Sequence, residues 1–179
     1  MHSLGDISKA LNRSVLYLSG LQARFELPVM EKSDYSAAYL ECLRTLVMLR
    51  TFNVAEKDLV TLWELEKKLL VLLHLDSSGS RTWFLDSCGV TAHIDRRLLL
   101  TNQDLGISLN RDQVQMGLNF CDSLPELFAG KEMGEDALRV LRECLTLRHR
   151  ILAQVDSELA NLRFALKWAK ARGARGWLV

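Results

Sequence analysis

Few residues in this 179-residue chain have the types and spacing that catalysis or metal binding requires. Cys88 and His93 could both bind a metal, but a single histidine on a strand is more often structural. The four cysteines (Cys42, Cys88, Cys121 and Cys144) form no C-x-x-C pair, which argues against a zinc site or a disulfide framework. The sequence contains no phosphate-binding loop, no nucleophile triad and no paired-carboxylate motif. The sequence therefore favours a protein that is not an enzyme and that needs no metal or cofactor.

Arg142 and His149 form the remaining pair with a candidate catalytic role. Their spacing on one predicted helix falls within the loose arginine–histidine pattern of HEPN-type ribonucleases. The pattern is unspecific, and we expect both side chains to be solvated or to lie at a helix–helix contact.

Charge is distributed unevenly along the chain, although the net charge is only +1. Residues 1–75 are neutral, residues 76–136 carry about −5, and residues 137–179 carry about +6. The middle segment and the C-terminal segment should therefore attract each other, within or between chains. The basic tail, residues 167–177, includes two tryptophans, and it could contact nucleic acid or the acidic middle segment.

Residues 138–169 show an uninterrupted heptad spacing, in which only Arg148 is polar. The apolar seam positions that we assign to dimerisation are Leu138, Leu141, Leu145, Leu152, Val155, Leu159, Leu162 and Leu166. A single helix cannot bury such a seam against itself, so it needs a partner helix from this chain or from a second copy. An ordinary long helix lying on a core is the alternative, but the length and regularity of the seam favour a homodimer.

Composition places the chain among helical proteins without a membrane segment. There are only two prolines, and apolar residues recur with a helical period over most of the length. No apolar run approaches membrane-spanning length, and residues 1–6 do not resemble a secretion signal. We expect a cytoplasmic protein, since scattered cysteines suit a reducing compartment.

The first 25 residues predict two short helices joined by a tight turn. The first should span residues 4–11 and end at Asn12, which tolerates the left-handed conformation. Ser14 can cap the second helix, which should run from residue 15 to about residue 25 and stop before Pro28. Two helices connected in this way indicate a helix-turn-helix.

Two longer helices and one hairpin are predicted to follow. Ser36 should cap a third helix that breaks at Asn53, and a fourth should begin near residue 55. Residues 76–80 indicate a linker, and residues 81–95 indicate a two-stranded hairpin with a Cys-Gly turn. We expect Trp83, Phe84 and His93 to pack against the preceding helices rather than to line a small-molecule pocket.

Residues 4–72 resemble the DNA-binding head of the MerR family of transcription regulators. Leu4-Gly5-Asp6-Ile7-Ser8-Lys9 stands where that family has an I-G-E-(L/V)-A-K helix, and Asn12 stands at the family's turn glycine. A second family motif runs in register with Tyr35-Ser36, Leu40, Leu43, Leu46, Leu49-Arg50, Asn53-Val54 and Asp58-Leu59, without a gap. The last helix also resembles the antiparallel dimerisation helix of that family.

The resemblance implies a mainly α fold with three parts. These are a winged helix-turn-helix head (1–75), a small middle segment with one β-hairpin (76–133), and a long dimerisation helix with a basic tail (134–179). It also implies a dimeric transcription regulator that places the helix beginning at Ser14 in the major groove of double-stranded DNA. The residues that it assigns to DNA are Arg13, Ser14, Leu16, Tyr17, Ser19, Arg24, Lys32 and Tyr35.

The chain departs from this family at the residues that would meet DNA. The family's second helix reads T-L-R-Y-Y or close to it, whereas this chain has Tyr17-Leu18-Ser19-Gly20-Leu21. The loop that would form the wing has Lys32 and Tyr35 but neither glycine nor arginine. Since phosphate contacts dominate DNA affinity, a neutral head also favours an alternative, a protein-interaction module that does not bind DNA.

Overall fold

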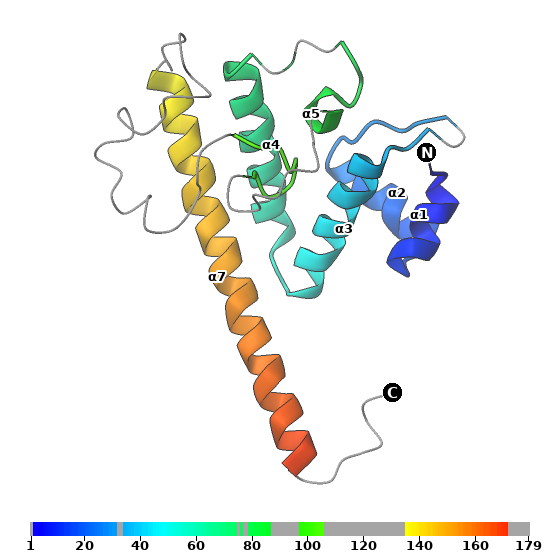
Figure 1. The fold of residues 1–179 in the computed structure, drawn as a ribbon, viewed down its shortest axis with the longest axis vertical. Coiled ribbons are helices and arrows are strands. Elements are labelled where there is room, and N and C mark those ends of the chain that lie inside the picture. Colours follow the sequence, from blue (N-terminus) through cyan, green and yellow to red (C-terminus); the bar gives the residue numbers. More distant parts are fainter. Residues whose placement is uncertain are drawn as a thin grey trace.

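The computed structural model describes residues 2–31, 34–74, 76, 79–86, 97–105 and 135–171. The described residues are mainly helical, as expected, and they form the helices α1 to α5 and α7 (Figure 1). Their only β pairings are two isolated antiparallel bridges, His2 with Tyr35 and Arg97 with Asp104. No helix in the described ranges is long and apolar enough to cross a membrane.

Helix α1 (Leu4–Leu11) forms because both of its ends are satisfied locally. Ser3 and Asp6 form a capping box at its start. Asn12 ends it in the left-handed conformation, with φ 49°, as the sequence predicted. Ile7 is its fully buried residue and holds the helix against the core.

Helix α2 (Val15–Arg24) begins after a three-residue turn, 12–14, and packs beside α1. The Ser14 side chain accepts a hydrogen bond from the Tyr17 N–H, which confirms the predicted cap. Leu18 and Leu21 are fully buried and fix which side of the helix faces the core. The opposite side of α2 therefore faces solvent.

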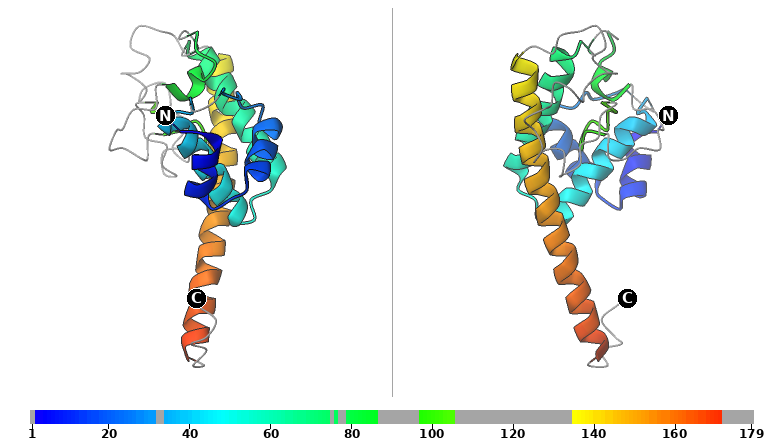
Figure 2. Two further views of the ribbon diagram at one scale, coloured as in Figure 1. Left: turned by 90° about the vertical axis from the view of Figure 1, so that its right-hand side faces the viewer. Right: turned by 60° about the vertical axis from the view of Figure 1, so that its left-hand side comes forward.

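Helices α3 (Ala37–Thr51) and α4 (Glu56–Leu72) start and stop close to the predicted positions. Ser36 caps α3, and Asn53 turns the chain with φ 59°. The Arg50 guanidinium donates to the Val54 carbonyl at 2.7 Å and braces this turn. The resulting arrangement of helices α1 to α4 is shown in Figure 2.

The prediction that residues 81–86 form the first strand of a hairpin is wrong. Residues 81 and 82 form a turn, and helix α5 (Trp83–Asp86) follows. One helical turn lets the consecutive residues Phe84 and Leu85 both enter the core, whereas a strand would direct them to opposite faces. Phe84 packs edge-to-face on Trp63 with ring centroids 5.1 Å apart, as expected for packing against the preceding helices. The rest of the predicted hairpin, with Cys88 and His93, lies outside the described residues.

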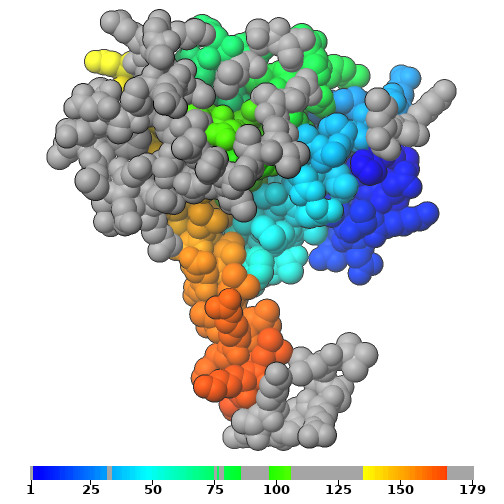
Figure 3. Space-filling model, viewed as in Figure 1, coloured from blue at the N-terminus to red at the C-terminus, as the bar shows by residue number. Residues whose placement is uncertain are grey.

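Helix α7 (Glu135–Ala171) is 37 residues long and has two parts that differ in their surroundings. Its first part lies along α4 and is held by buried residues from Ala137 to Ile151. Arg150 forms an ion pair with Asp58 at 2.9 Å, and the Gln154 amide donates to the Asn53 carbonyl at 2.8 Å. Beyond these contacts the helix projects away from the body, as Figures 1 and 3 show.

Candidate functional site

The exposed face of α2 is the surface to which the sequence assigned DNA contacts. Arg13, Ser14, Leu16 and Ser19 are exposed on this face, and Tyr17 is half-buried against the core. Leu16 is the most exposed large apolar side chain among the described residues, at 84%, and Val15 beside it is exposed as well. The start of α2 thus presents one cation together with apolar side chains.

Arg24 does not offer an unpaired cation at this surface. Its guanidinium forms an ion pair with the Glu56 carboxylate at 2.6 Å, which ties the end of α2 to the start of α4. A phosphate would have to compete with that carboxylate. Lys32, the other cation assigned to phosphates, lies outside the described residues.

Tyr35 is not available to DNA, which corrects its assignment as a phosphate contact. Its side chain is 2% exposed, and its hydroxyl accepts hydrogen bonds from the Gln22 amide and from the Met30 N–H. Its backbone forms the bridge with His2 through hydrogen bonds of 2.8 and 3.2 Å. Tyr35 therefore ties the N-terminus and the loop after α2 to α3.

Beside Tyr35, the Gln22 amide also donates a hydrogen bond to the Tyr39 hydroxyl at 2.9 Å, and the Tyr39 hydroxyl donates one to the Pro28 carbonyl at 2.9 Å. Burial raises the pKa of Tyr39, so its phenol keeps the proton at neutral pH. This network fixes the loop that follows α2.

The predicted dimerisation seam is divided between two environments. Leu141 and Leu145 are buried within the chain, among the residues of α7 that lie along α4. Leu138 and Val155 are half-buried and pack against the core, and Leu152, Leu159 and Leu166 are half-buried. Leu162 is 53% exposed on the same seam, and Phe164 and Trp168 nearby are 71% and 51% exposed. The distal part of α7, residues 152–168, therefore leaves an apolar surface uncovered by the described residues.

Arg142 and His149 are not brought into any catalytic arrangement that the described residues show. Arg142 is exposed, and His149 is half-buried. The basic tail beyond residue 171 lies outside the described residues.

Glu66 is a buried acidic residue that the sequence reasoning missed. It is fully buried in α4, and its carboxylate accepts the successive backbone N–H groups of Leu99, Leu100 and Thr101 at 2.7 to 3.1 Å. The Thr101 hydroxyl donates to it as well, at 3.0 Å. One carboxylate thereby anchors the loop 97–105 to α4. The available signal was its position four residues after Leu62 and three before Leu69, on the apolar face of the helix.

Burial raises the pKa of Glu66, and the hydrogen bonds from the loop lower it only in part. A raised pKa in the folded state means that Glu66 contributes most to stability below its ordinary pKa, and that this contribution is lost as the pH rises through the folded-state pKa. The free energy of unfolding of the wild type, measured relative to Glu66→Gln in urea, should therefore fall from about pH 4.5, the ordinary pKa of this carboxyl group, upward and then level off. A difference that rises or stays constant between pH 4 and pH 8 would contradict this assignment.

No protein-family model matches this chain, and no curated protein or solved structure shows significant similarity to it. Its function is therefore inferred from the surfaces of α2 and distal α7.

Proposed function

We propose that this chain is a dimeric, DNA-binding transcription regulator with a MerR-like winged helix-turn-helix head. The observation that carries the proposal is the combination of two features in one chain. One is a pair of short helices, α1 and α2, joined by a left-handed turn, with the start of α2 exposed. The other is a 37-residue helix whose distal seam is not covered by the described residues.

The connection between the N-terminus and the loop before α3 supports a winged head. The bridge between His2 and Tyr35 closes this loop beside the helix pair. In the proposed complex the start of α2 enters the major groove, and the loop lies near the phosphate backbone. Arg13, Leu16, Tyr17 and Ser19 then lie near bases or phosphates.

The apolar seam of distal α7 supports a second copy of this chain as the partner. Each copy would pair this seam with that of the other, antiparallel as the MerR resemblance implies, so that two heads are presented to one duplex. Two recognition helices related by a twofold axis read a palindromic site.

The DNA prediction is tested by selection from random duplex DNA at low salt. We expect a palindromic motif and a shallow salt dependence, because each head offers few unpaired cations. Arg13→Ala should weaken binding to all DNA sequences. It should also reduce by about one the slope of the logarithm of the binding constant against the logarithm of the salt concentration. Tyr17→Ala should instead change the sequence preference. Lys57→Ala, which removes an exposed cation from α4, is the matched control and should bind as the wild type does.

The second candidate is a protein-interaction module, and the exposed apolar start of α2 favours it. Leu16 and Val15 are exposed, whereas Arg24 is already paired with Glu56. A selection that returns no motif for the folded dimer would reject the regulator and leave this module. Leu16→Asp then becomes the variant expected to abolish partner binding.

A further inference from the structure

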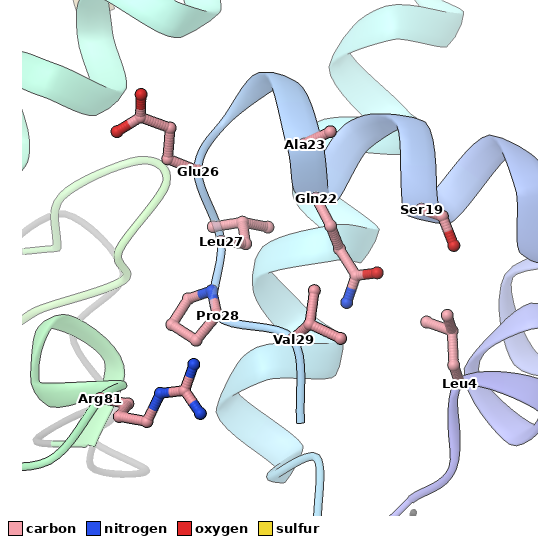
Figure 4. A pocket seen from close by; sticks show the side chains of 9 residues that line it. All are labelled: Leu4, Ser19, Gln22, Ala23, Glu26, Leu27, Pro28, Val29 and Arg81. Atoms are coloured by element: carbon pink, nitrogen blue, oxygen red, sulfur yellow. The ribbon is translucent and has the colours of Figure 1, made fainter. Parts of the chain in front are cut away.

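A pocket of about 680 Å³ opens beside α2 (Figure 4). Its walls come from α1, α2, the loop 25–29 and the turn before α5. Most of the lining is apolar, from Leu4, Ala23, Leu27, Pro28 and Val29. The volume lies within the range of about 300 to 1,000 Å³ that is typical of small-molecule sites.

The Gln22 amide is held in one orientation by groups outside the pocket. Tyr39 donates its hydroxyl proton to the Pro28 carbonyl, so it can only accept from Gln22, and the Gln22 atom that it contacts must be the nitrogen. The same nitrogen donates to Tyr35 at 3.1 Å. The amide oxygen is thereby left on the pocket side, and Figure 4 shows it pointing into the space toward Leu4 and Ser19.

This oxygen is an acceptor without a partner on an otherwise buried residue. Gln22 is 3% exposed, and among the described residues nothing donates to its amide oxygen. The oxygen itself faces the open pocket and can be reached by solvent, so a ligand with a donor at this point would take the place of water. Because the Tyr39 contact fixes the amide, the acceptor is already oriented before any ligand arrives.

Arg81 supplies a positive charge at another part of the pocket. Its side chain is exposed and forms no ion pair within the described part of the chain. In Figure 4 its guanidinium points toward Pro28, and it approaches the pocket from the side opposite Gln22. The carboxylate of Glu26 points away from these groups in the same view. The pocket therefore combines a cation, an apolar wall and a separate acceptor.

We propose that this pocket binds a small amphipathic monocarboxylate. The carboxylate pairs with the Arg81 guanidinium, the apolar body lies against Leu27, Pro28 and Val29, and a hydroxyl or N–H at the far end donates to the Gln22 amide oxygen. The assignment does not depend on DNA binding or on dimerisation.

The probe that fits this description is 3-(4-hydroxyphenyl)propionate, which has a carboxylate at one end and a hydroxyl donor at the other. Calorimetric titration into the full chain should give saturable binding. In nitrogen-15 NMR spectra, the Gln22 side-chain amide signals should shift during the same titration. Two matched probes isolate the polar contacts: 3-phenylpropionate lacks the donor, and the methyl ester of the first probe lacks the charge. Each should bind at least about tenfold more weakly, which corresponds to about 1.4 kcal/mol.

Variants of the pocket test the same contacts from the protein side. Arg81→Gln should weaken binding of the probe at least about tenfold, and it should abolish the preference for the acid over its methyl ester. Lys57→Gln removes an exposed cation outside the pocket and should change neither quantity. Ala23→Trp places a large ring in the pocket and should prevent binding.

Arg81 and Ala23 are both exposed, so these substitutions should leave the fold intact, and thermal unfolding checks this. The proposal is overturned if the probe does not bind at millimolar concentration. It is also overturned if the three probes bind equally, or if Arg81→Gln and Lys57→Gln behave alike.

Discussion

Replacing Glu66 with leucine is expected to lower the free energy of unfolding by at least about 3 kcal/mol, because several buried donors would lose their shared acceptor. The backbone N–H groups of Leu100 and Thr101 and the hydroxyl of Thr101 all depend on this carboxylate. Leucine is similar in size but offers no acceptor. The loop 97–105 should detach, and its buried residues Leu98, Leu100 and Leu105 would become exposed to solvent.

Urea unfolding of the wild type and the variant measures this effect. Glu64→Leu is the matched control, because Glu64 is an exposed glutamate on the same helix, and the change should alter stability by no more than about 0.5 kcal/mol. Hydrogen exchange provides a local measurement: the Leu100 and Thr101 amides should lose protection in Glu66→Leu while those of α1 keep it. Equal effects of the Glu64 and Glu66 substitutions would show that the carboxylate does not anchor the loop.

The second large effect is expected from Leu152→Asp combined with Leu159→Asp, which should convert a dimer into a monomer. Both residues lie on the distal seam of α7 and are half-buried in the single chain. Pairing with a second copy would bury the two new carboxylates without partners, at a cost of several kcal/mol for each charge. Light scattering at micromolar concentration should therefore give twice 20.3 kDa for the wild type and 20.3 kDa for the variant.

A second pair of substitutions separates a seam effect from a general effect of charge. Ala153→Asp combined with Ala160→Asp adds the same charge to exposed positions of the same helix, outside the heptad seam. This control should remain dimeric. A monomeric wild type would contradict the dimer proposal, and equal dissociation of both variants would place the contact elsewhere than the seam.

Sequence by itself determined the helix ends, because they depend on neighbouring residues. Ser14 and Ser36 cap helices by accepting backbone N–H groups three residues ahead, and such contacts exist whatever the rest of the chain does. Asn12 and Asn53 adopt the left-handed conformation for a similarly local reason. The mainly helical architecture followed from the same short-range patterns. The MerR resemblance and the assigned DNA contacts other than Tyr35 remain predictions.

Only the tertiary structure decided how these helices are used. The heptad seam is continuous in sequence, yet α7 is buried along α4 at Leu141 and Leu145 and is left exposed at Leu162. Residues 81–86 suit a strand by local pattern, but contact with Trp63 makes a helical turn the better way to bury Phe84 and Leu85. Glu66 and Tyr35 are polar residues that the sequence pattern placed at the surface or left unassigned. They are buried because partners distant in the chain satisfy their hydrogen bonds, and such pairing depends on how the helices meet in space.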